Sequence, residues 1–251
     1  MISIVTPAYN AIEYIDDTIN MVLRQTYTDW EWIIVEDGST DGTRQLLQRL
    51  ESSGELDARI HPVYLDDNKD RAAGARNRGI DEAKGEYIAF LDVDDVWMPD
   101  KLKKQYDYMQ QEDVAFSFTG YEFGDENAIP TGRVVHVPKT LTYKQALSRT
   151  VIFTTTVMFD MKKLDKDMIH MPCVGSEDTA TWWKILRSGV QAYGIDEVLA
   201  IYRRPSTSLS SNKMLAIKRI WNLYRNVEGL GILKSSFYFC GWAYRATVRR
   251  L

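Results

Sequence analysis

The chain has 251 residues, of which 45% are hydrophobic and 26% are charged, and its formal net charge at pH 7 is −4. This composition is typical of a globular protein with one α/β domain, or with one domain and an appendage. The negative charge excludes a general attraction to nucleic acid, and no uninterrupted apolar stretch is long enough to cross a bilayer. Cys173 and Cys240 form no metal-binding spacing and no disulfide framework. With no charged leader before the first apolar strand, we expect a reducing cytoplasm.

Short apolar runs alternate with segments of helical periodicity through the first half of the chain. The expected strands cover residues 2–6, 32–35, 60–65, 87–91 and 114–118, with Pro7 stopping the first. The expected helices cover residues 12–25, about 41–50, 72–83 and 99–111. This alternation predicts a mainly parallel sheet with helices on both faces.

The second half is less regular. Residues 120–138 predict a connector or a hairpin, 141–149 a short helix, 151–159 a strand and 198–202 a last strand. Ser176 is expected to cap a helix that carries Trp182 and Trp183 on different faces, one in the core and one toward a site. Residues 213–251 predict helices with a break at 229–231.

Three carboxylates follow the buried strand at residues 87–91. Because side chains alternate along a strand, Asp92 and Asp94 are expected on one face. Carboxylates this close repel each other unless a cation compensates them, and carboxylates with substrate phosphates are the usual ligands of Mg²⁺. The alternative, an acidic loop or helix cap, accounts for Asp95 and Asp100.

Polar residues also follow the first two strands. Asp37 can accept a hydrogen bond from an N–H donor such as the imide of uracil, whereas helix capping is assigned to Ser39 and Asp41. Tyr9 suits either stacking on a base or simple packing. Since ligands of parallel sheets bind at the carboxyl ends of the strands, these groups predict one shared site.

Two further charged groups have two interpretations each. Arg71 and Arg76 could reach a phosphate, or with Arg78 form a solvated helix face. Glu177 and Asp178 open a helix, where the dipole stabilises carboxylates whatever their function. The sequence contains no GxGxxG, GxxxxGK[ST] or GxSxG motif.

Together these stretches resemble the family-2 inverting glycosyltransferases of the GT-A fold, and above all the bacterial enzymes of teichuronic-acid, capsule and O-antigen synthesis. The matching segments lie in family order at residues 5–10, 35–41, 75–79, 90–95, 177–178 and 202–208, with subgroup likeness at 116–121 and 209–213. The resemblance implies a GT-A catalytic domain over residues 1–212. Residues 1–119 would bind a nucleotide-sugar and 120–212 the acceptor, and a helical C-terminal extension would cover 213–251.

The resemblance also implies a role for each matching position. The base of the nucleotide-sugar would contact Pro7, Tyr9 and Asp37, and its phosphates would lie beside Arg71 and Arg76. The DXD motif would be Asp92-Val93-Asp94, with Asp94 and Asp92 as the metal-binding residues and Asp94 preferred as the direct ligand of Mn²⁺ or Mg²⁺. Asp178 would be the general base, and Glu177 would orient it or touch the acceptor.

Two segments depart from the family pattern. The loop from Asn68 to Arg71 lacks the glycine that many relatives carry there, so its shape differs. Pro205 replaces a histidine that can assist the metal or the diphosphate, which leaves Arg203, Arg204 or Ser208 to cover the diphosphate.

The implied reaction is inverting transfer from a UDP-sugar to a lipid-linked saccharide in bacterial surface polysaccharide synthesis. Two alternatives remain open from the sequence: a nucleotidyltransferase, and a non-catalytic nucleotide-sugar-binding module. The aromatic and basic residues of 213–251 suit either packing on the catalytic domain or contact with anionic lipid. We therefore expect peripheral attachment to the cytoplasmic face of the bacterial inner membrane.

Overall fold

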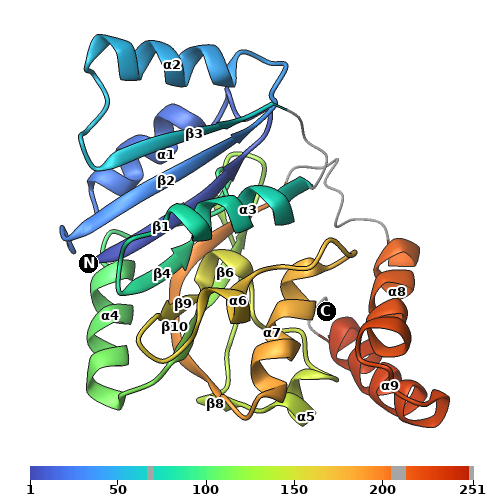
Figure 1. Cartoon of the computed structure of the whole chain (residues 1–251). Helices are drawn as coiled ribbons and strands as arrows, with labels where there is room; N and C mark the ends of the chain where they lie inside the picture. Colours follow the sequence, from blue (N-terminus) through green and yellow to red (C-terminus); the bar gives the residue numbers. More distant parts are fainter. Residues whose placement is uncertain (67–70, 205–212, 249–251) are drawn as a thin grey trace.

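A computed structural model describes residues 1–66, 71–204 and 213–248, without the side chains of Arg71, Lys213 and Val248 (Figure 1). The strands are β1 (Ile2–Ala8), β2 (Trp30–Asp37), β3 (Ile60–Leu65), β4 (Tyr87–Phe90), β5 (Val96–Trp97), β6 (Phe116–Gly124), β7 (Pro130–Val135), β8 (Thr140–Leu141), β9 (Met158–Asp160) and β10 (Ala192–Arg203). The α-helices are α1 (Ile15–Leu23), α2 (Thr43–Ser53), α3 (Arg71–Glu82), α4 (Lys101–Glu112), α5 (Tyr143–Ala146), α6 (Lys166–Ile169), α7 (Glu177–Arg187), α8 (Lys213–Asn222) and α9 (Ile232–Val248). A 3₁₀ turn, η1 (Thr154–Thr156), precedes β9, and a π-helical turn, η3 (Leu223–Val227), follows α8.

One sheet runs through the molecule in the order β3-β2-β1-β4-β9-β6-β10-β5. The four strands from β3 to β4 are parallel, as expected, and so is the pair of β6 and β10. Between these parallel parts β9 is antiparallel to both β4 and β6. Helix α3 lies across one face of β1 and β2 while α1 lies behind them (Figure 1), which confirms the expected helices on both faces.

The core follows the apolar runs of the sequence. All residues of β4 and of β2 are buried, and β1 is buried except for Pro7. Strand β1 continues through Pro7 to Ala8, so the expectation that Pro7 stops it is wrong. The reason is that β4 pairs only as far as Val5, which leaves the missing N–H of Pro7 on a side of β1 with no strand partner.

Three local predictions of the second half need correction. Residues 151–159 contain only the short strand β9, because η1 interrupts the Thr-rich run. Ser176 precedes α7 in the left-handed region, at φ 61°, and its side chain makes no capping hydrogen bond. Trp182 and Trp183 are both buried, Trp182 among aromatic rings of the sheet and Trp183 stacked on Tyr224 at a centroid distance of 5.2 Å.

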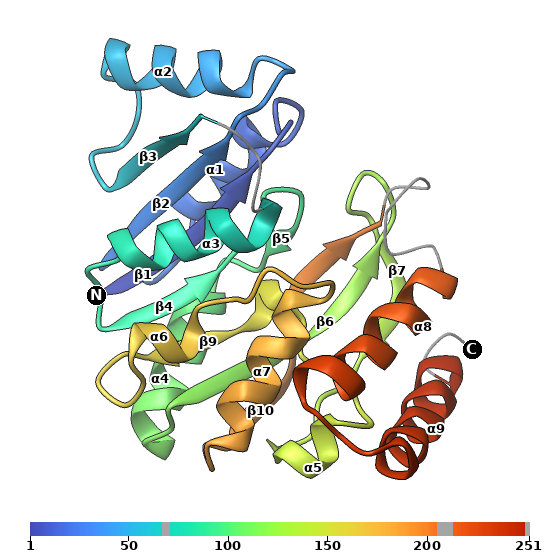
Figure 2. The ribbon, with the colours of Figure 1, turned by 45° about the vertical axis from the view of Figure 1, so that its right-hand side comes forward.

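The C-terminal helices form a pair beside α5 and α7, at the end of the molecule away from α2 (Figures 1 and 2). Leu223 and Tyr224 of η3 are fully buried, and the Tyr224 hydroxyl donates to the carbonyl of Leu147. Within the described residues, no helix is both long and apolar enough to cross a membrane.

Candidate active site

The DXD segment lies in a turn rather than at the end of a regular strand. Strand β4 ends at Phe90, and the backbone N–H of Asp95 donates to the carbonyl of Asp92 over 3.0 Å. The strand alternation used to place Asp92 and Asp94 on one face therefore does not apply to them. The turn leads into β5, which pairs antiparallel with the end of β10 and brings Arg203 to the same place.

Arg76 connects Asp92 to Glu177, two acidic residues that the sequence analysis treated as separate groups. Its side chain is 6% exposed, and Nη2 donates to Oδ1 of Asp92 at 2.6 Å while Nη1 donates to Oε1 of Glu177 at 3.3 Å. The nearby carboxylates, Asp92 first, raise the pKa of Arg76 against the opposing effect of burial. A single buried guanidinium thus connects the turn after β4 to the first turn of α7.

Asp94 lies beside Asp92, and the charges of Arg203 and Arg76 only partly offset the effects of this neighbour and of burial. Burial, and then repulsion from Asp92, raise the pKa of Asp94 to about 6. Around this turn lie five carboxylates, Asp92, Asp94, Asp95, Glu177 and Asp178, whereas the described cations of the cluster are Arg76 and Arg203. This excess of negative charge fits a divalent cation.

No three described Asp, Glu, His or Cys side chains converge in a way that would hold a metal ion without other ligands. A cation held through one or two carboxylates and the phosphates of a substrate is consistent with that observation. Asp92 is already bonded to Arg76, which leaves Asp94 as the better direct ligand.

Asp95 fixes the turn from beneath. It is buried, its Oδ2 accepts from Oγ1 of Thr155 at 2.5 Å, and its Oδ1 accepts from the backbone N–H of Arg203 at 3.2 Å. Burial raises the pKa of Asp95 well above its usual range. Arg203 also donates through Nε to the carbonyl of Asp94 at 2.6 Å. The prediction that Asp95 belongs to an acidic loop or a helix cap did not include these contacts, which hold the turn in place.

Asp178 lies in the first turn of α7, beside the Arg76 bridge. Its Oδ2 accepts from Oγ1 of Thr154 at 3.4 Å and its Oδ1 from the backbone N–H of Thr179 at 2.6 Å. Burial, and then the charge of Asp178, raise the pKa of the neighbouring Glu177. The short hydrogen bond from Thr179 orients the Asp178 carboxylate, while Oδ2 makes only the longer contact with Thr154.

Asn77 positions the segment before α7, a role that the sequence did not reveal. Its Nδ2 donates to the carbonyl of Met171 at 2.8 Å, and its Oδ1 accepts from the N–H of Met171 at 2.7 Å. This paired contact joins α3 to a loop 94 residues further along the chain. An asparagine one position after Arg76 was the available signal, but its partner could not be found without the fold.

The ends of β1 and β2 form the second part of the site. The N–H of Asn10 donates to Oγ of Ser39 at 2.9 Å, and Oδ1 of Asn10 accepts from the N–H of Thr40 at 2.9 Å. Asp41 bonds the N–H of Thr43 at the start of α2, as expected, whereas Ser39 bonds Asn10 and does not cap the helix.

These hydrogen bonds join the loops after β1 and β2, and the expected base-binding residues lie at this edge of the sheet. Asp37 is buried at the end of β2, Pro7 is half-buried, and Tyr9 is 48% exposed. The side chain of Tyr9 is therefore accessible to a ligand and does not belong to the core.

The structure describes only some of the other residues that were expected to contact phosphate. The guanidinium of Arg204 lies over the Phe123 ring, 5.2 Å from its centroid. Arg71 begins α3, but its side chain lies outside the described residues, as do Pro205, Ser208 and the loop at 67–70.

The chain belongs to the family described as Glycosyl transferase family 2, whose profile matches residues 3–168. That match and the fold confirm the expected α/β GT-A fold and identify the chain as a glycosyltransferase. It is 45% identical to TuaG of Bacillus subtilis, assigned as a teichuronic acid biosynthesis glycosyltransferase, over 100% of this chain and 98% of that protein. It is 36% identical to WfgD of Escherichia coli, a UDP-Glc:α-D-GlcNAc-diphosphoundecaprenol β-1,3-glucosyltransferase, over 89% of this chain and 85% of that one.

Solved structures share the fold at low sequence identity. The mannosyltransferase PcManGT of Pyrobaculum calidifontis, in complex with GDP-Man and Mn²⁺, superposes with a TM-score of 0.73 at 19% identity, covering 98% of this chain and 73% of that one. Residues 1–349 of TarS of Staphylococcus aureus, in complex with UDP, superpose with a TM-score of 0.68 at 17% identity, covering 97% and 71%.

Proposed function

We propose that this glycosyltransferase transfers a sugar from a UDP-sugar to a lipid-linked saccharide, with inversion at the anomeric carbon. The observation that carries the proposal is the Arg76 bridge, which joins Asp92 of the DXD turn to Glu177, the neighbour of Asp178. The bridge connects the turn that carries the expected DXD motif to the helix that carries the candidate base. The names of the relatives, a glucosyltransferase that uses UDP-Glc and a teichuronic acid enzyme, support the substrate class.

The residues divide the chemistry between them. Pro7, Tyr9 and Asp37 would bind the uracil, and Asp178 would remove the proton of the acceptor hydroxyl as it attacks the anomeric carbon. A positioned base typically contributes about a hundred- to ten-thousand-fold in rate.

The charged groups around the turn would complete the donor site. Arg71 and Arg76 would lie beside the donor phosphates, and Arg203 or Arg204 would cover the diphosphate. A divalent cation, Mn²⁺ or Mg²⁺, held by Asp94 with the donor phosphates, would neutralise the charge that grows on the departing diphosphate.

Attachment to a membrane surface completes the proposal. Leu233, Phe237, Cys240 and Tyr244 repeat at helical spacing on α9 and are exposed, Leu233 to 84% and Phe237 to 74%. The opposite face of α9 is fixed to the domain, where Nε1 of Trp242 donates to Oγ1 of Thr150 at 3.2 Å. One face of α9 is therefore docked, and the other presents apolar side chains to the surroundings.

The charge of the extension points to anionic lipid. Residues 213–251 contain eight lysines and arginines against one acidic residue, Glu228, whereas residues 1–212 contain 23 basic and 34 acidic residues. An apolar face beside basic side chains is typical of helices that lie on a membrane. The protein would attach to the cytoplasmic face of the bacterial inner membrane, where a lipid-linked acceptor is held.

A product analysis tests the reaction. The full chain is incubated with a panel of UDP-sugars, Mn²⁺ or Mg²⁺, and an N-acetylglucosamine linked through diphosphate to a short lipid. We expect UDP as the released product and an extended saccharide on the lipid. Release of pyrophosphate would instead indicate a nucleotidyltransferase, and no turnover with any donor would indicate a binding module.

A further inference from the structure

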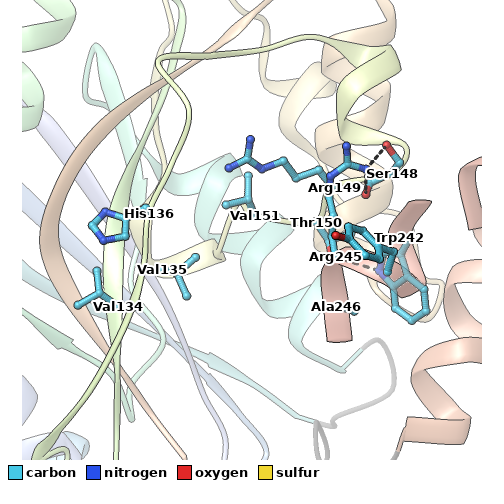
Figure 3. Close-up of a pocket in the computed structure, with 11 residues that line it drawn as sticks. Val134, Val135, His136, Ser148, Arg149, Thr150, Val151, Trp242, Arg245 and Ala246 are labelled. Carbon is cyan, nitrogen blue, oxygen red and sulfur yellow. Dashed lines mark hydrogen bonds between the residues drawn. The ribbon is translucent and has the colours of Figure 1, made fainter. Parts of the chain in front are cut away.

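A cavity of about 300 Å³ lies outside the cluster described above, between β7, the segment 148–151 and the last turns of α9. Figure 3 shows the His136 and Val134 side chains on the β7 side and Trp242, Arg245 and Ala246 on the α9 side. The Arg149 side chain extends from the segment between them toward the stretch of chain after β7 that carries His136 (Figure 3). The cavity is therefore shared by the acceptor half and the C-terminal extension.

The lining is basic, in contrast to the carboxylate cluster at Asp94. Its charged residues are Arg149 and Arg245, and it contains no Asp or Glu among the described residues that form its walls. Hydroxyl groups of Ser148, Thr150 and Tyr244 add donors, so the cavity offers an anion both positive charge and hydrogen bonds.

The α9 wall is held in place. Nη1 of Arg245 donates to the carbonyl and to Oγ of Ser148, at 3.2 and 3.0 Å. A Cβ added at Gly241 would come within 2.9 Å of Cβ of Ser148, so the helix and the segment are in close contact there. On the other side, Nδ1 of His136 lies 3.1 Å from Oδ1 of Asp196. Both walls are thus set before a ligand binds.

The cavity lies between the candidate base and the exposed face of α9. Val151 in its wall is three residues before Thr154, which contacts Asp178, and three residues span at most about 11 Å. On the far side, Tyr244 in its wall also belongs to the exposed row of α9 side chains. A molecule with a sugar at Asp178 and a lipid at the membrane would pass through this region.

We infer that the cavity binds the diphosphate that joins sugar and lipid in the acceptor, an inference that rests on the proposed function. The guanidinium of Arg149 contacts the diphosphate, and Arg245 adds charge while it holds α9 against Ser148. The sugar then extends toward Asp178 and the lipid toward the exposed face of α9. The acceptor diphosphate is bound apart from the donor diphosphate, which lies at the Asp94 turn.

The test measures binding of farnesyl diphosphate, which carries a lipid and a diphosphate but no sugar, to the full chain by calorimetry without divalent metal. Farnesol is the neutral comparison. Arg149→Gln removes one charge from the cavity, and Ala246→Phe fills it without changing its charge. Lys144→Gln removes an exposed charge of α5 outside the cavity and is the matched control. UDP binding with Mn²⁺ and the melting temperature verify that each variant is folded.

We expect Arg149→Gln and Ala246→Phe each to weaken farnesyl diphosphate binding about tenfold or more. The first variant loses one charge-assisted hydrogen bond, and the second loses the space for the ligand. Lys144→Gln should bind farnesyl diphosphate as tightly as the wild type. Equal affinity in wild type and both cavity variants would overturn the inference. If farnesyl diphosphate binds equally but Arg149→Gln no longer binds phosphatidylglycerol vesicles, the cavity serves membrane lipid and the inference is wrong. If the variants lose binding while no sugar transfer is found, the cavity assignment stands and the proposed reaction fails.

Discussion

The residues at the carboxyl edge of the parallel strands are mostly buried and hydrogen-bonded within the molecule, whereas the C-terminal helices leave large side chains exposed. At the edge, Arg76, Asp95 and Asn77 are each bonded to partners far away in sequence, and their side chains are largely enclosed. On α9, by contrast, large apolar side chains such as Leu233 and Phe237 remain exposed after the helix has docked.

This difference separates two tasks. A reaction that moves charge needs groups whose positions are fixed before the substrate arrives, and buried hydrogen-bonded networks provide that. Attachment to a surface needs accessible area instead, and an exposed row of apolar side chains beside basic ones provides it. Changes at the edge should therefore affect turnover, whereas changes on α9 should affect location.

The largest effect is expected for Asp178→Asn. The amide keeps the shape and the hydrogen bond from Thr179 but cannot take up a proton, so turnover should fall about a hundred- to ten-thousand-fold. UDP binding in the presence of Mn²⁺, measured by calorimetry, should not change. Asp167→Asn, at a carboxylate that is 98% exposed on α6, is the matched control and should be active.

The neighbouring acid, Glu177, is the alternative candidate for the base, and two results would contradict the prediction. If Asp178→Asn keeps most of its activity while Glu177→Gln loses it, the base is Glu177. Loss of both activity and UDP binding in Asp178→Asn would mean that the substitution disturbs the Arg76 bridge.

The next largest effect is expected for Asp94→Asn, which should lose metal-dependent UDP binding and yet stabilise the metal-free protein. The folded pKa of about 6 lies above the ordinary 3.8, so the folded form holds a proton between those values that the unfolded chain has released. Stability contributed by this group is therefore present below about pH 4 and is lost as pH rises through about 6.

At pH 8 the substitution should raise the free energy of unfolding by about 3 kcal/mol, with the gain shrinking as pH falls to 4. Urea unfolding of both proteins in chelator, at several pH values, measures this. A gain of the same size at every pH would show that Asp94 is not an ionised, repelled carboxylate. Equal Mn²⁺-dependent UDP affinity in both proteins would remove it from the metal site.

Much of the edge could be predicted because parallel strands bring their carboxyl ends together whatever else the fold does. Asp37, Asp92 and Tyr9 each follow an apolar run, and that pattern alone placed them at one edge of a sheet. A strand was predicted within residues 151–159, but its antiparallel position between β4 and β6 was not, because the partners and direction of a strand depend on contacts far away in sequence.

Roles that depend on distant partners were also beyond the sequence. The sequence predicted Asp95 to be part of an acidic loop or a helix cap, whereas in the structure it accepts hydrogen bonds from Thr155 and from the backbone of Arg203. Trp182 and Trp183 were divided between core and site by helical geometry, but both are buried because α7 is enclosed on two sides, by the sheet and by η3. Periodicity gives the faces of a helix and not the number of faces that are covered.

The proposed attachment to a membrane should respond to Leu233→Ser combined with Phe237→Ser on the exposed face of α9. Burying one such side chain contributes about 1.5–3 kcal/mol, so partial immersion of two should make vesicle binding about ten- to a hundredfold weaker when lost. Flotation with phosphatidylglycerol vesicles measures this, and Ile129→Ser, at a residue that is 59% exposed in the β6–β7 connection, is the control. Arg245 is unsuitable for this test because it bonds Ser148 and holds α9 in place. Equal flotation of all three proteins would leave α9 with a purely structural role.

The smallest effect is expected at Lys101, a buried residue at the start of α4. Its side chain is fully buried at the first residue of α4, has no hydrogen-bond partner among the described residues, and places Nζ 3.9 Å from the centroid of the Trp97 ring. Burial lowers the pKa of Lys101 well below its usual range, and the positive end of the helix dipole opposes a charge there as well. An unbonded buried ammonium costs several kcal/mol, which outweighs a cation–π contact of about 2 kcal/mol.

Lys101→Met keeps the volume and removes the amine, so we expect the free energy of unfolding at pH 7 to rise by about 1–2 kcal/mol. In the wild type the unfolded chain binds a proton that the folded chain does not between the lowered pKa and 10.5, so stability rises with pH across that window. The advantage of the variant should therefore shrink as pH rises toward 10. Unfolding in urea at pH 7 and pH 10 measures both values. A lower stability at pH 7 would show that the ammonium stays charged on the Trp97 ring and contributes to the fold.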